Sequence, residues 1–451
     1  MSVPTIRART AEHLLADGEA RLLGAVSTVT GAMTRLDLGG ARLLVDCGIA
    51  QGREASRWVF PPEAAEVDAV LLTHGHQDHI GSLPALLEAG YRGPIYATAA
   101  TLEVARISLE DSLDMNRIDE RDIKRFLHDF NQLARMVPYD RPIEPMRDRG
   151  ITARFVEAGH ILGSASIDLQ SERSRIILSG DLGRPDSPIL LDPCTSWGSE
   201  RPVDLVVCEC TYGNRDHAHD AESIKSELRE VITATVRRRG KVLIPAFAIG
   251  RTQVLLYFLN DLVESGALPP VPVAIDTPMG LSITETYDHF RNLFDKEAMD
   301  RLQRGDDPLD FRSLFAVRSG RDSFRLTEHD GPFVIIAGSG MCQGGRILRH
   351  LKEGLDDPRN TVLFVGHQST GTLGQRILDA ENGARLRIEG QEIEVLAERR
   401  VLKGLSAHAD RSELCAWLSH LPSPRAIALH HGEAEAQDEF VKFATERLAA
   451  R

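Results

Sequence analysis

The sequence contains few cysteines and no long hydrophobic run. Six cysteines are scattered along its 451 residues, with no Cys-x-x-Cys pair. This spacing excludes a disulfide framework or a zinc ribbon and fits a reducing cytosol, so we expect a cytoplasmic protein. No stretch approaches ~20 uninterrupted apolar residues, so we expect no contact with a membrane. The charged start of the chain lacks the apolar core of a secretory signal.

The chain also lacks an excess of positive charge. It has 53 Lys and Arg against 66 Asp and Glu, which gives a net charge of −13 at pH 7. This balance excludes a histone-like protein that binds any polyanion over its whole surface, although local basic patches remain open. With 42% hydrophobic and 26% charged residues, the composition is that of a folded globular protein. Length alone suggests domains of roughly 150 residues, about three in all.

Short segments rich in Val, Ile and Leu alternate with segments of helical spacing, which predicts α/β layers. We expect the charged segment 111–145 to be mostly helical and to form a solvated insertion. The expected strands are 42–45, 69–73, 152–157, 175–179, 204–209, 241–246, 332–337, 361–366 and 425–429. The expected helices are 224–239, 252–265, 283–294, 411–421 and 434–449.

One segment carries a dense group of possible metal ligands. Thr-His-Gly-His-Gln-Asp-His holds His74, His76, Asp78 and His79 between an expected strand and an expected helix. Imidazole nitrogens with a carboxylate are donors that zinc prefers. His74 and His76 can point to the same side of an extended segment and share one metal, while Asp78 and His79 face a second. A solvated His-rich turn is the alternative, and the density of ligands speaks against it.

Two zinc ions would need more ligands than this segment supplies. His160, Asp181 and His431 each follow or end an expected strand. A single histidine in such a place is more often an ordinary loop residue. Because ligand sites in α/β layers lie at the carboxyl ends of strands, we expect the three to join the segment above at one sheet edge.

Together these residues resemble the metallo-β-lactamase-fold hydrolases and, within them, the β-CASP nucleases, especially short RNA-processing members. The resemblance covers nearly the whole chain, including Leu44-Val-Asp-Cys-Gly around Asp46. Three further motifs mark the nuclease branch: Glu-Cys-Thr-Tyr-Gly at Glu209, Leu-Ser-Ala-His-Ala-Asp at His408, and His-His-Gly-Glu at His431. The family has histidine directly before Gly-Glu, which favours His431 over His430 and RNA over DNA.

The resemblance implies the architecture. We expect an α/β fold in which a metallo-β-lactamase αββα sandwich contains an inserted α/β β-CASP domain. The sandwich would be formed by residues 1–209 and a return segment, 386–451. The β-CASP domain would span residues 210–385, with the active site in the cleft between the two domains.

The resemblance also assigns the metals and the catalytic groups. It implies two Zn²⁺ per chain, with Mn²⁺ as an alternative metal, and a bridging hydroxide that attacks phosphorus. Asp78 would orient this nucleophile, and His408, held in its charged form by Glu209, would protonate the leaving 3′-oxygen. Asp46 would accept a hydrogen bond from a ligand histidine. The implied ligands are His74, His76 and His160 for one zinc, Asp78, His79 and His431 for the other, and Asp181 between them.

Glycine-rich segments of the insert are candidates for holding the RNA backbone. Glycines at the start of a helix let backbone N–H groups approach an anion. Each segment alone is more often a tight turn, and the joint match to the family's insert is what favours binding. The candidate phosphate-binding residues are Ser339, Gly340, Arg346, Arg251, Gly371 and Thr372.

The sequence therefore predicts a zinc-dependent ribonuclease that cuts single-stranded RNA to 5′-phosphate and 3′-hydroxyl ends. The alternatives are a hydrolase of small esters or thioesters and a non-catalytic RNA-processing subunit. Internal and 5′-exonucleolytic cleavage both remain open, as does a homodimer, and no obligatory protein partner is evident. We assign no role to about twenty N-terminal residues or to His367, which replaces a usual tyrosine.

Overall fold

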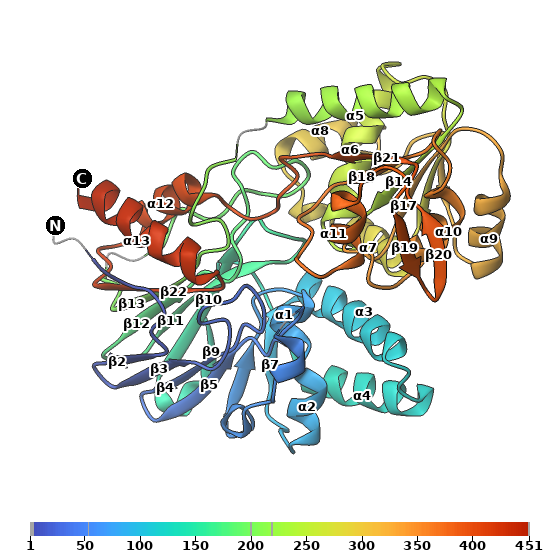
Figure 1. The fold of residues 1–451 in the computed structure, drawn as a ribbon. Coiled ribbons are helices and arrows are strands. Elements are labelled where there is room, and N and C mark those ends of the chain that lie inside the picture. The colour runs from blue at the N-terminus through green and yellow to red at the C-terminus, as the bar shows by residue number, and fades with distance from the viewer. Residues whose placement is uncertain (1–3, 53, 199–200, 218–219, 450–451) are drawn as a thin grey trace. The chain divides into compact units, whose positions relative to one another are not determined.

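The chain divides into two compact units (Figure 1). The computed structural model describes residues 4–52, 54–198, 201–217 and 220–449. Residues 1–216 and 407–451 form the first unit, and residues 217–406 form the second. The bounds 210–385 that the resemblance implies for the insert stay a prediction. No helix in the described residues is long and apolar enough to cross a membrane.

One seven-stranded sheet of the first unit follows the order of the chain, β2-β3-β4-β5-β6-β7-β8. Its strands β2 to β5 are antiparallel, and β5 to β8 are parallel. Gly39 and Gly40, both at positive φ, make the two-residue turn between β4 and β5. The strands are β2 (Glu12–Leu15), β3 (Gly18–Leu22), β4 (Thr34–Leu38), β5 (Ala41–Val45), β6 (Ala69–Leu71), β7 (Ile95–Thr98) and β8 (Ala134–Val137).

The other seven-stranded sheet has the order β1-β22-β13-β12-β11-β10-β9. Strands β12, β13 and β22 are parallel, and β10 runs in the same direction because two antiparallel steps separate it from β12. Their carboxyl ends therefore lie at one edge. The strands are β1 (Thr5–Arg7), β22 (Ala426–His430), β13 (Leu205–Glu209), β12 (Arg175–Leu178), β11 (Ala165–Gln170), β10 (Ile151–Glu157) and β9 (Ile143–Met146).

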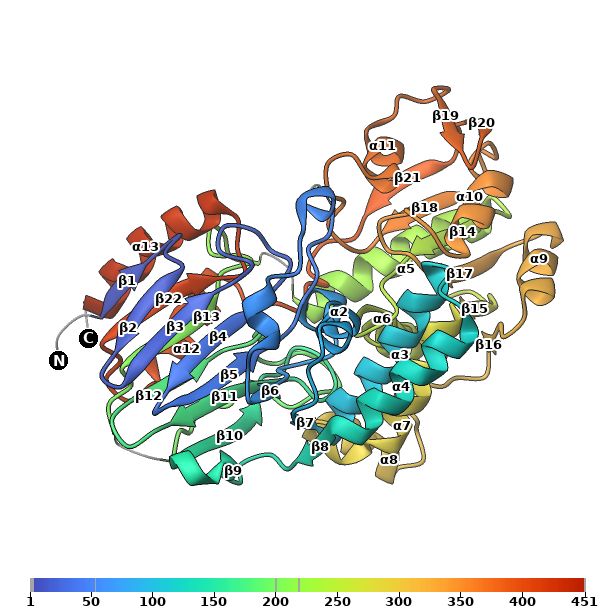
Figure 2. The same ribbon diagram turned by 90° about the horizontal axis from the view of Figure 1, so that it is seen from below.

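The two sheets pack face to face, with helices on both outer faces (Figure 2). Leu36 and Leu43 from one sheet share a buried cluster with Phe155 and Ile167 from the other. This arrangement confirms the predicted αββα sandwich. Helices α1 (Gln77–Ile80), α2 (Leu83–Glu88), α3 (Ala99–Met115) and α4 (Glu120–Leu133) cover the first sheet, and α12 (Arg411–Ser419) and α13 (Ala434–Ala449) cover the second.

The segment 111–145 differs from the prediction of a mostly helical, solvated insertion. After α3 and α4 it forms β8 and β9, which are the edge strands of the two sheets. Phe126 and Phe130 of α4 are buried in the core beneath the first sheet. Each edge strand exposes a charged side chain, Arg135 in β8 and Glu144 in β9, so neither sequence has the pattern of a buried strand.

The N-terminal residues, which had no predicted role, complete both sheets. Strand β1 pairs with β22 in parallel, with Thr5 opposite Ala426 and Ile6 opposite Ile427. Strands β2 and β3 extend the other sheet as an antiparallel pair. β1 thus covers the edge of the strand that leads to His431.

The second unit is built on a six-stranded sheet in the order β16-β15-β17-β14-β18-β21, with every neighbouring pair parallel. Leu243 and Ile335 pack against helices α10 and α11, and their neighbours Val242 and Ile336 are also buried, so both sheet faces are covered. The strands are β14 (Lys241–Pro245), β15 (Val273–Asp276), β16 (Leu314–Ala316), β17 (Phe333–Ala337), β18 (Thr361–Phe364) and β21 (Glu398–Val401), with the hairpin β19 (Arg385–Ile388) and β20 (Gln391–Glu394). The helices are α5 (Ala221–Arg237), α6 (Arg251–Glu264), α7 (Pro278–His289), α8 (Lys296–Gln303), α9 (Gly320–Glu328), α10 (Ile347–Gly354) and α11 (Leu373–Asp379).

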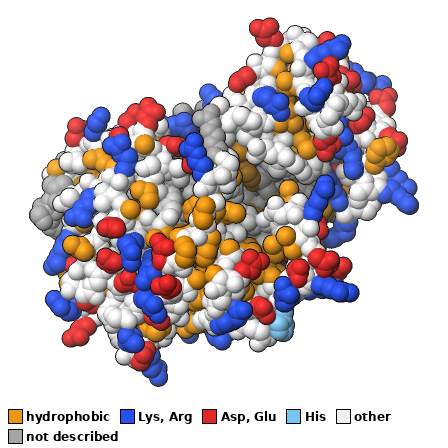
Figure 3. All heavy atoms as spheres, turned by 60° about the horizontal axis from the view of Figure 1, so that its bottom comes forward, with side chains coloured by type: hydrophobic (Ala, Val, Ile, Leu, Met, Phe, Trp, Pro, Cys, Tyr) orange, Lys and Arg blue, Asp and Glu red, His pale blue; other side chains and the backbone are white. Residues whose placement is uncertain are grey.

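Positive and negative side chains are mixed on one face of the molecule. On the face shown in Figure 3, Lys and Arg side chains are interspersed with Asp and Glu side chains, and hydrophobic side chains lie between them. A net charge of −13 is therefore compatible with local positive regions.

Candidate metal centre

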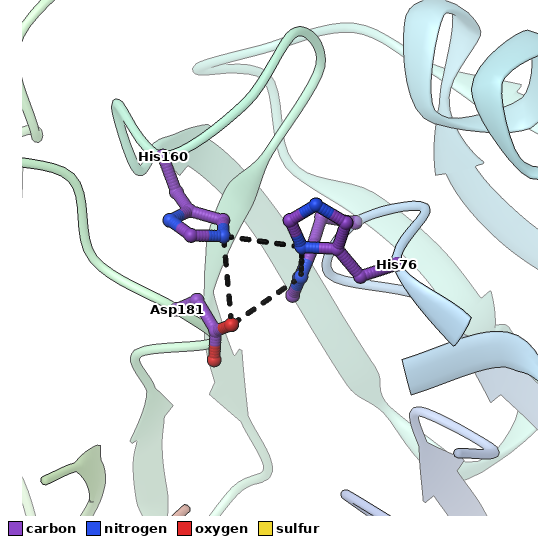
Figure 4. Close-up of side chains that lie close together, drawn as sticks. His76, His160 and Asp181 are labelled. Carbon is purple, nitrogen blue, oxygen red and sulfur yellow. Dashed lines mark hydrogen bonds and ion pairs between the residues drawn. The ribbon is translucent and has the colours of Figure 1, made fainter. Parts of the chain in front are cut away.

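Four side chains from three loops of the first unit have donor atoms near a common centre. Figure 4 labels three of them, His76, His160 and Asp181, which point toward one another. The donor atoms of His74, His76, His160 and Asp181 all lie within 4.8 Å of one another. His76 Nδ1 is 3.1 Å from His74 Nε2 and 3.2 Å from His160 Nε2. Asp181 Oδ2 is 3.4 Å from His74 Nε2 and 3.6 Å from His160 Nε2.

These separations fit a tetrahedral metal ion. Bonds of ~2.0–2.1 Å at tetrahedral angles place neighbouring donor atoms about 3.3–3.4 Å apart. Three imidazole nitrogens and one carboxylate oxygen form a donor set that divalent transition metals bind. The group is therefore a candidate site for a divalent cation.

The other oxygen of Asp181 faces a second group of donors. Asp78, His79 and His431 also have donor atoms within 4.8 Å of one another. His79 Nε2 is 3.2 Å from Asp181 Oδ1, and His431 Nε2 is 3.3 Å from Asp78 Oδ2. His79 Nε2 and Asp181 Oδ1 are buried and face each other, and neither has another hydrogen-bond partner among the described residues. Such buried polar atoms are costly unless a ligand engages them, which makes this group a second candidate metal position.

Asp46 and Thr73 orient two of the ligand histidines. His79 Nδ1 donates to Asp46 Oδ2 at 2.7 Å, which leaves Nε2 directed at Asp181. Asp46 also accepts from the backbone N–H of Thr73 at 2.7 Å and from its hydroxyl at 2.8 Å. The same hydroxyl oxygen lies 3.1 Å from His74 Nδ1. Contacts of this kind fix the ring and the tautomer of a metal ligand.

The remaining ring nitrogens of His160 and His431 also have partners. His160 Nδ1 lies 3.2 Å from the carbonyl oxygen of Ala407, and His431 Nδ1 lies 3.1 Å from the hydroxyl of Thr211. The neighbouring His430 is directed elsewhere, with Nε2 3.0 Å from the carbonyl oxygen of Gly24. Sequence reasoning missed Thr73 and Thr211 as positioning residues, although both stand inside the motifs that it identified.

Burial keeps three of the histidines unprotonated. Burial and neighbouring imidazoles hold the pKa of His74 and of His160 well below the ordinary value. Burial likewise lowers the pKa of His76 to about 4. At neutral pH these rings therefore present lone pairs to a cation, which is the form that metal binding requires.

The acidic groups of the cluster stay ionised. Burial opposes the charge of Asp78, but the hydrogen bond from His431 and nearby imidazoles lower its pKa to about 2. The pKa of Asp181 is held well below its ordinary value, because His431 and His79 outweigh the effect of burial. Conversely, the carboxylates of Asp181 and Asp46 overcome burial and raise the pKa of His79. The cluster thus offers negative oxygens to a cation.

Glu209 and His408 form a pair beside the metal donors. His408 Nδ1 is 3.1 Å from Glu209 Oε1 and 3.9 Å from Asp181 Oδ2. The backbone N–H of Leu182 donates to Glu209 Oε1 at 2.7 Å, and that of Thr211 donates to Oε2 at 3.2 Å. Burial opposes the charge on His408, but Glu209 and Asp181 outweigh it and raise the pKa to about 9. His408 can therefore hold a proton at neutral pH, as a general acid must.

The sequence predicts that the donors share the edge of one sheet. In the structure they come from two different sheets. His74 and His76 follow β6 of the first sheet. His160, Asp181 and His431 follow β10, β12 and β22 of the second sheet. The face-to-face packing of the sandwich brings these carboxyl ends together.

The predicted phosphate-binding residues all lie in the second unit. They lie in the loops that follow the adjacent strands β14, β17 and β18, or at the start of the helix after each loop. Two of their guanidinium groups have internal partners: Arg346 Nη1 donates to Asp276 Oδ1 at 2.7 Å, and Arg251 donates to the carbonyl of Val365. The hydroxyl of Thr372 caps α11 by accepting from the N–H of Gln375 at 3.2 Å. Phosphate binding by these residues stays a prediction.

Comparison with known proteins places the chain in a family. Residues 29–239 match the metallo-beta-lactamase superfamily, residues 252–377 match the Beta-Casp domain, and residues 392–449 match the Zn-dependent metallo-hydrolase RNA specificity domain. Ribonuclease TTHA0252 of Thermus thermophilus is 40% identical over 425 residues, which cover 91% of this chain and 92% of that protein. The chain belongs to the β-CASP family of the metallo-β-lactamase superfamily.

Other relatives agree with this placement. An RNase J-like protein of Methanocaldococcus jannaschii is 31% identical, and the match covers 87% of each chain. Transcription termination factor FttA of Methanosarcina mazei is 29% identical, and the match covers 92% of this chain but 67% of FttA. The crystal structure of a protein of unknown function from Enterococcus faecalis V583 shares the fold, with a TM-score of 0.55 at 12% identity, and covers 94% of this chain and 96% of that one.

Proposed function

We propose that this β-CASP protein is a metal-dependent ribonuclease that hydrolyses phosphodiester bonds of single-stranded RNA. The main support for this proposal is that buried imidazole and carboxylate donors converge around Asp181, with the Glu209–His408 pair beside them. A related chain with 40% identity is named a ribonuclease, and one with 31% identity is named RNase J-like. The match to an RNA specificity domain supports the choice of substrate.

The proposed cofactor is a pair of Zn²⁺ ions, for which Mn²⁺ can substitute. His74, His76 and His160 would hold one ion, and Asp78, His79 and His431 the other. Asp181 would serve both, since its two oxygens face different donor groups. When bound, such ions activate water and neutralise charge that develops on a phosphoryl group.

The chain's own residues would orient and protonate the reacting groups. Asp78, ionised at neutral pH, would accept a hydrogen bond from the attacking water and so direct it at phosphorus. His408 would donate its proton to the leaving 3′-oxygen, and Glu209 would position the ring and keep it charged. General acid catalysis of this kind is worth about 10²–10⁴ in rate. Attack by water in this direction leaves a 5′-phosphate and a 3′-hydroxyl.

The test is incubation of the purified protein with RNA labelled at either end. Asp78→Ala and His408→Ala should each abolish most cleavage, because one loses a metal donor and the other the acid. His420→Ala is the matched control, since this exposed histidine bonds to the Ala416 carbonyl at the end of α12. Intact RNA with the wild-type protein, or equal cleavage by wild type and both variants, would refute the proposal.

The same experiment separates the alternatives. Mononucleotides released from the 5′ end would indicate exonucleolytic cleavage, and labelled fragments would indicate internal cleavage. Turnover of a thioester without RNA cleavage would instead favour a small-molecule hydrolase. Less than one zinc per chain, with no cleavage, would favour a non-catalytic subunit.

A further inference from the structure

Phe247 is an exposed aromatic ring on a fixed backbone. It follows β14 and leaves 41% of its surface exposed, although Ala246 and Ala248 on either side are buried. Its carbonyl oxygen accepts from the N–H of Thr252 at 3.2 Å and from the Thr252 hydroxyl at 2.8 Å. The backbone N–H of Ala246 donates to Ala337 at 3.0 Å. The backbone that carries the exposed ring is thus held by hydrogen bonds to β17 and to the start of α6.

Glycines from two neighbouring loops support this ring. A Cβ atom at Gly340 would lie 2.9 to 3.1 Å from three ring atoms of Phe247, so only glycine allows this approach. A Cβ atom at Gly366 would lie 3.6 Å from the same ring. The buried Gln368 ties the two loops together, because its Nε2 donates to the Gly340 carbonyl at 2.9 Å and to the Gly366 carbonyl at 3.2 Å.

We infer that Phe247 is a stacking platform for an unpaired nucleobase of the RNA. The inference rests on the proposed ribonuclease function and names a contact that the substrate makes. A rigid ring with an open surface suits base stacking, which is how proteins commonly hold single strands. Arg251, four residues further along the chain and the first residue of α6, adds the positive charge that suits the adjoining phosphates.

The test compares the affinity of the full, metal-loaded chain for two fluorescent oligonucleotides whose phosphorothioate linkages resist cleavage. One is a single-stranded RNA, and the other has the same sugar-phosphate chain without bases. Phe247→Ala should weaken binding of the RNA by about 5- to 150-fold, the range of one base–aromatic stack. It should leave binding of the abasic chain unchanged, because that chain has no base to stack.

Three more variants exclude a general structural effect. Phe247→Trp should restore affinity for the RNA, whereas Phe247→Leu, which fills the space beside Gly340 without a flat ring, should resemble Phe247→Ala. Phe324→Ala is the control, because Phe324 of α9 is 51% exposed in the same unit and has no proposed role.

Two outcomes would overturn the platform. In the first, Phe247→Ala binds RNA as tightly as the wild type; in the second, it weakens binding of both oligonucleotides equally, which would indicate a phosphate-binding or protein-contacting surface. If the wild type neither binds nor cleaves RNA, the proposed function itself fails. A wild type that cleaves RNA normally while Phe247→Ala binds normally refutes only the platform.

Discussion

At the residue scale, two members of the candidate centre adopt unusual backbone conformations. Asp46 has φ of 61° and His431 has φ of 49°, in the left-handed region that favours glycine. Asp46 directly follows β5, and His431 directly follows β22. At each position the turn ends the alternation of side chains between the two faces of the sheet. Backbone strain of this kind persists where the surrounding structure imposes it, often at functional sites.

Asp46 should influence metal affinity without contacting the metal. Asp46→Asn removes the negative charge and weakens the hydrogen bond that orients His79, so metal affinity should fall by about 10- to 100-fold. Metal titration followed by assay of RNA cleavage should show lost activity that excess metal restores. Asp148→Asn, on the exposed surface beside Arg149, should change neither quantity. Unchanged metal affinity in Asp46→Asn would contradict the role.

Glu209 should set the pH range in which His408 acts as an acid. The carboxylate raises the pKa of His408 to about 9, so cleavage should decline as pH rises through that value and His408 loses its proton. In Glu209→Gln the raising charge is gone, and the decline should move to lower pH, toward the ordinary histidine value of about 6.5. A profile of kcat/KM against pH measures the shift. An alkaline limb in the same place for both proteins would refute the pairing.

At the scale of elements, the strand β22 depends on both of its neighbours. It lies between β1 and β13, and it ends at His430, directly before His431. Without β1, the edge of β22 would expose unpaired backbone groups. The N-terminal segment therefore supports one of the loops that carry the metal donors.

Removal of β1 should destabilise the first unit. A chain that begins at Arg9 loses the ladder from Thr5 to Arg7 and the packing of Ile6 against the α12–α13 side of the sheet. We expect the free energy of unfolding to fall by about 1–3 kcal/mol, measured by urea denaturation. Ile6→Ala should give a smaller decrease, because it keeps the backbone ladder. An unchanged midpoint in the shortened chain would show that β1 contributes no stability.

At the scale of the whole molecule, the net charge of −13 must be reconciled with a polyanionic substrate. Asp78, Asp181 and Glu209 contribute to that charge but face the candidate metal centre, where bound cations would offset them. Over the visible face, both signs are mixed (Figure 3). The overall charge is therefore a poor guide to the region that meets RNA.

RNA binding should weaken as salt rises. Each phosphate that Lys or Arg neutralises releases counterions, and for single strands the slope of log affinity against log salt is about −0.7 per phosphate contacted. We expect a clearly negative slope between 50 and 300 mM KCl, measured by fluorescence anisotropy with an unstructured RNA. An affinity that does not depend on salt would mean that few phosphates are held by charge.

Much of the architecture was readable from the sequence because buried strands have a strong local signature. The apolar segments that form β10, β12, β13, β14 and β17 were all expected as strands. The edge strands β8 and β9 were missed, since exposed positions admit charged residues and weaken the pattern. The N-terminal strands were missed for a related reason, because their burial depends on partners that lie far along the chain, such as Ala426 for Thr5.

The sequence by itself determined which chemical groups are available. The density of ligands from His74 to His79 depends only on residue type and spacing, and not on how the chain packs. Only the tertiary structure decided that Asp181 faces both donor groups, that Thr73 and Thr211 orient ligand rings, and that Phe247 lies exposed against Gly340. The physical reason is that ring orientation and burial depend on side chains brought together from distant strands, and no local pattern records those distances.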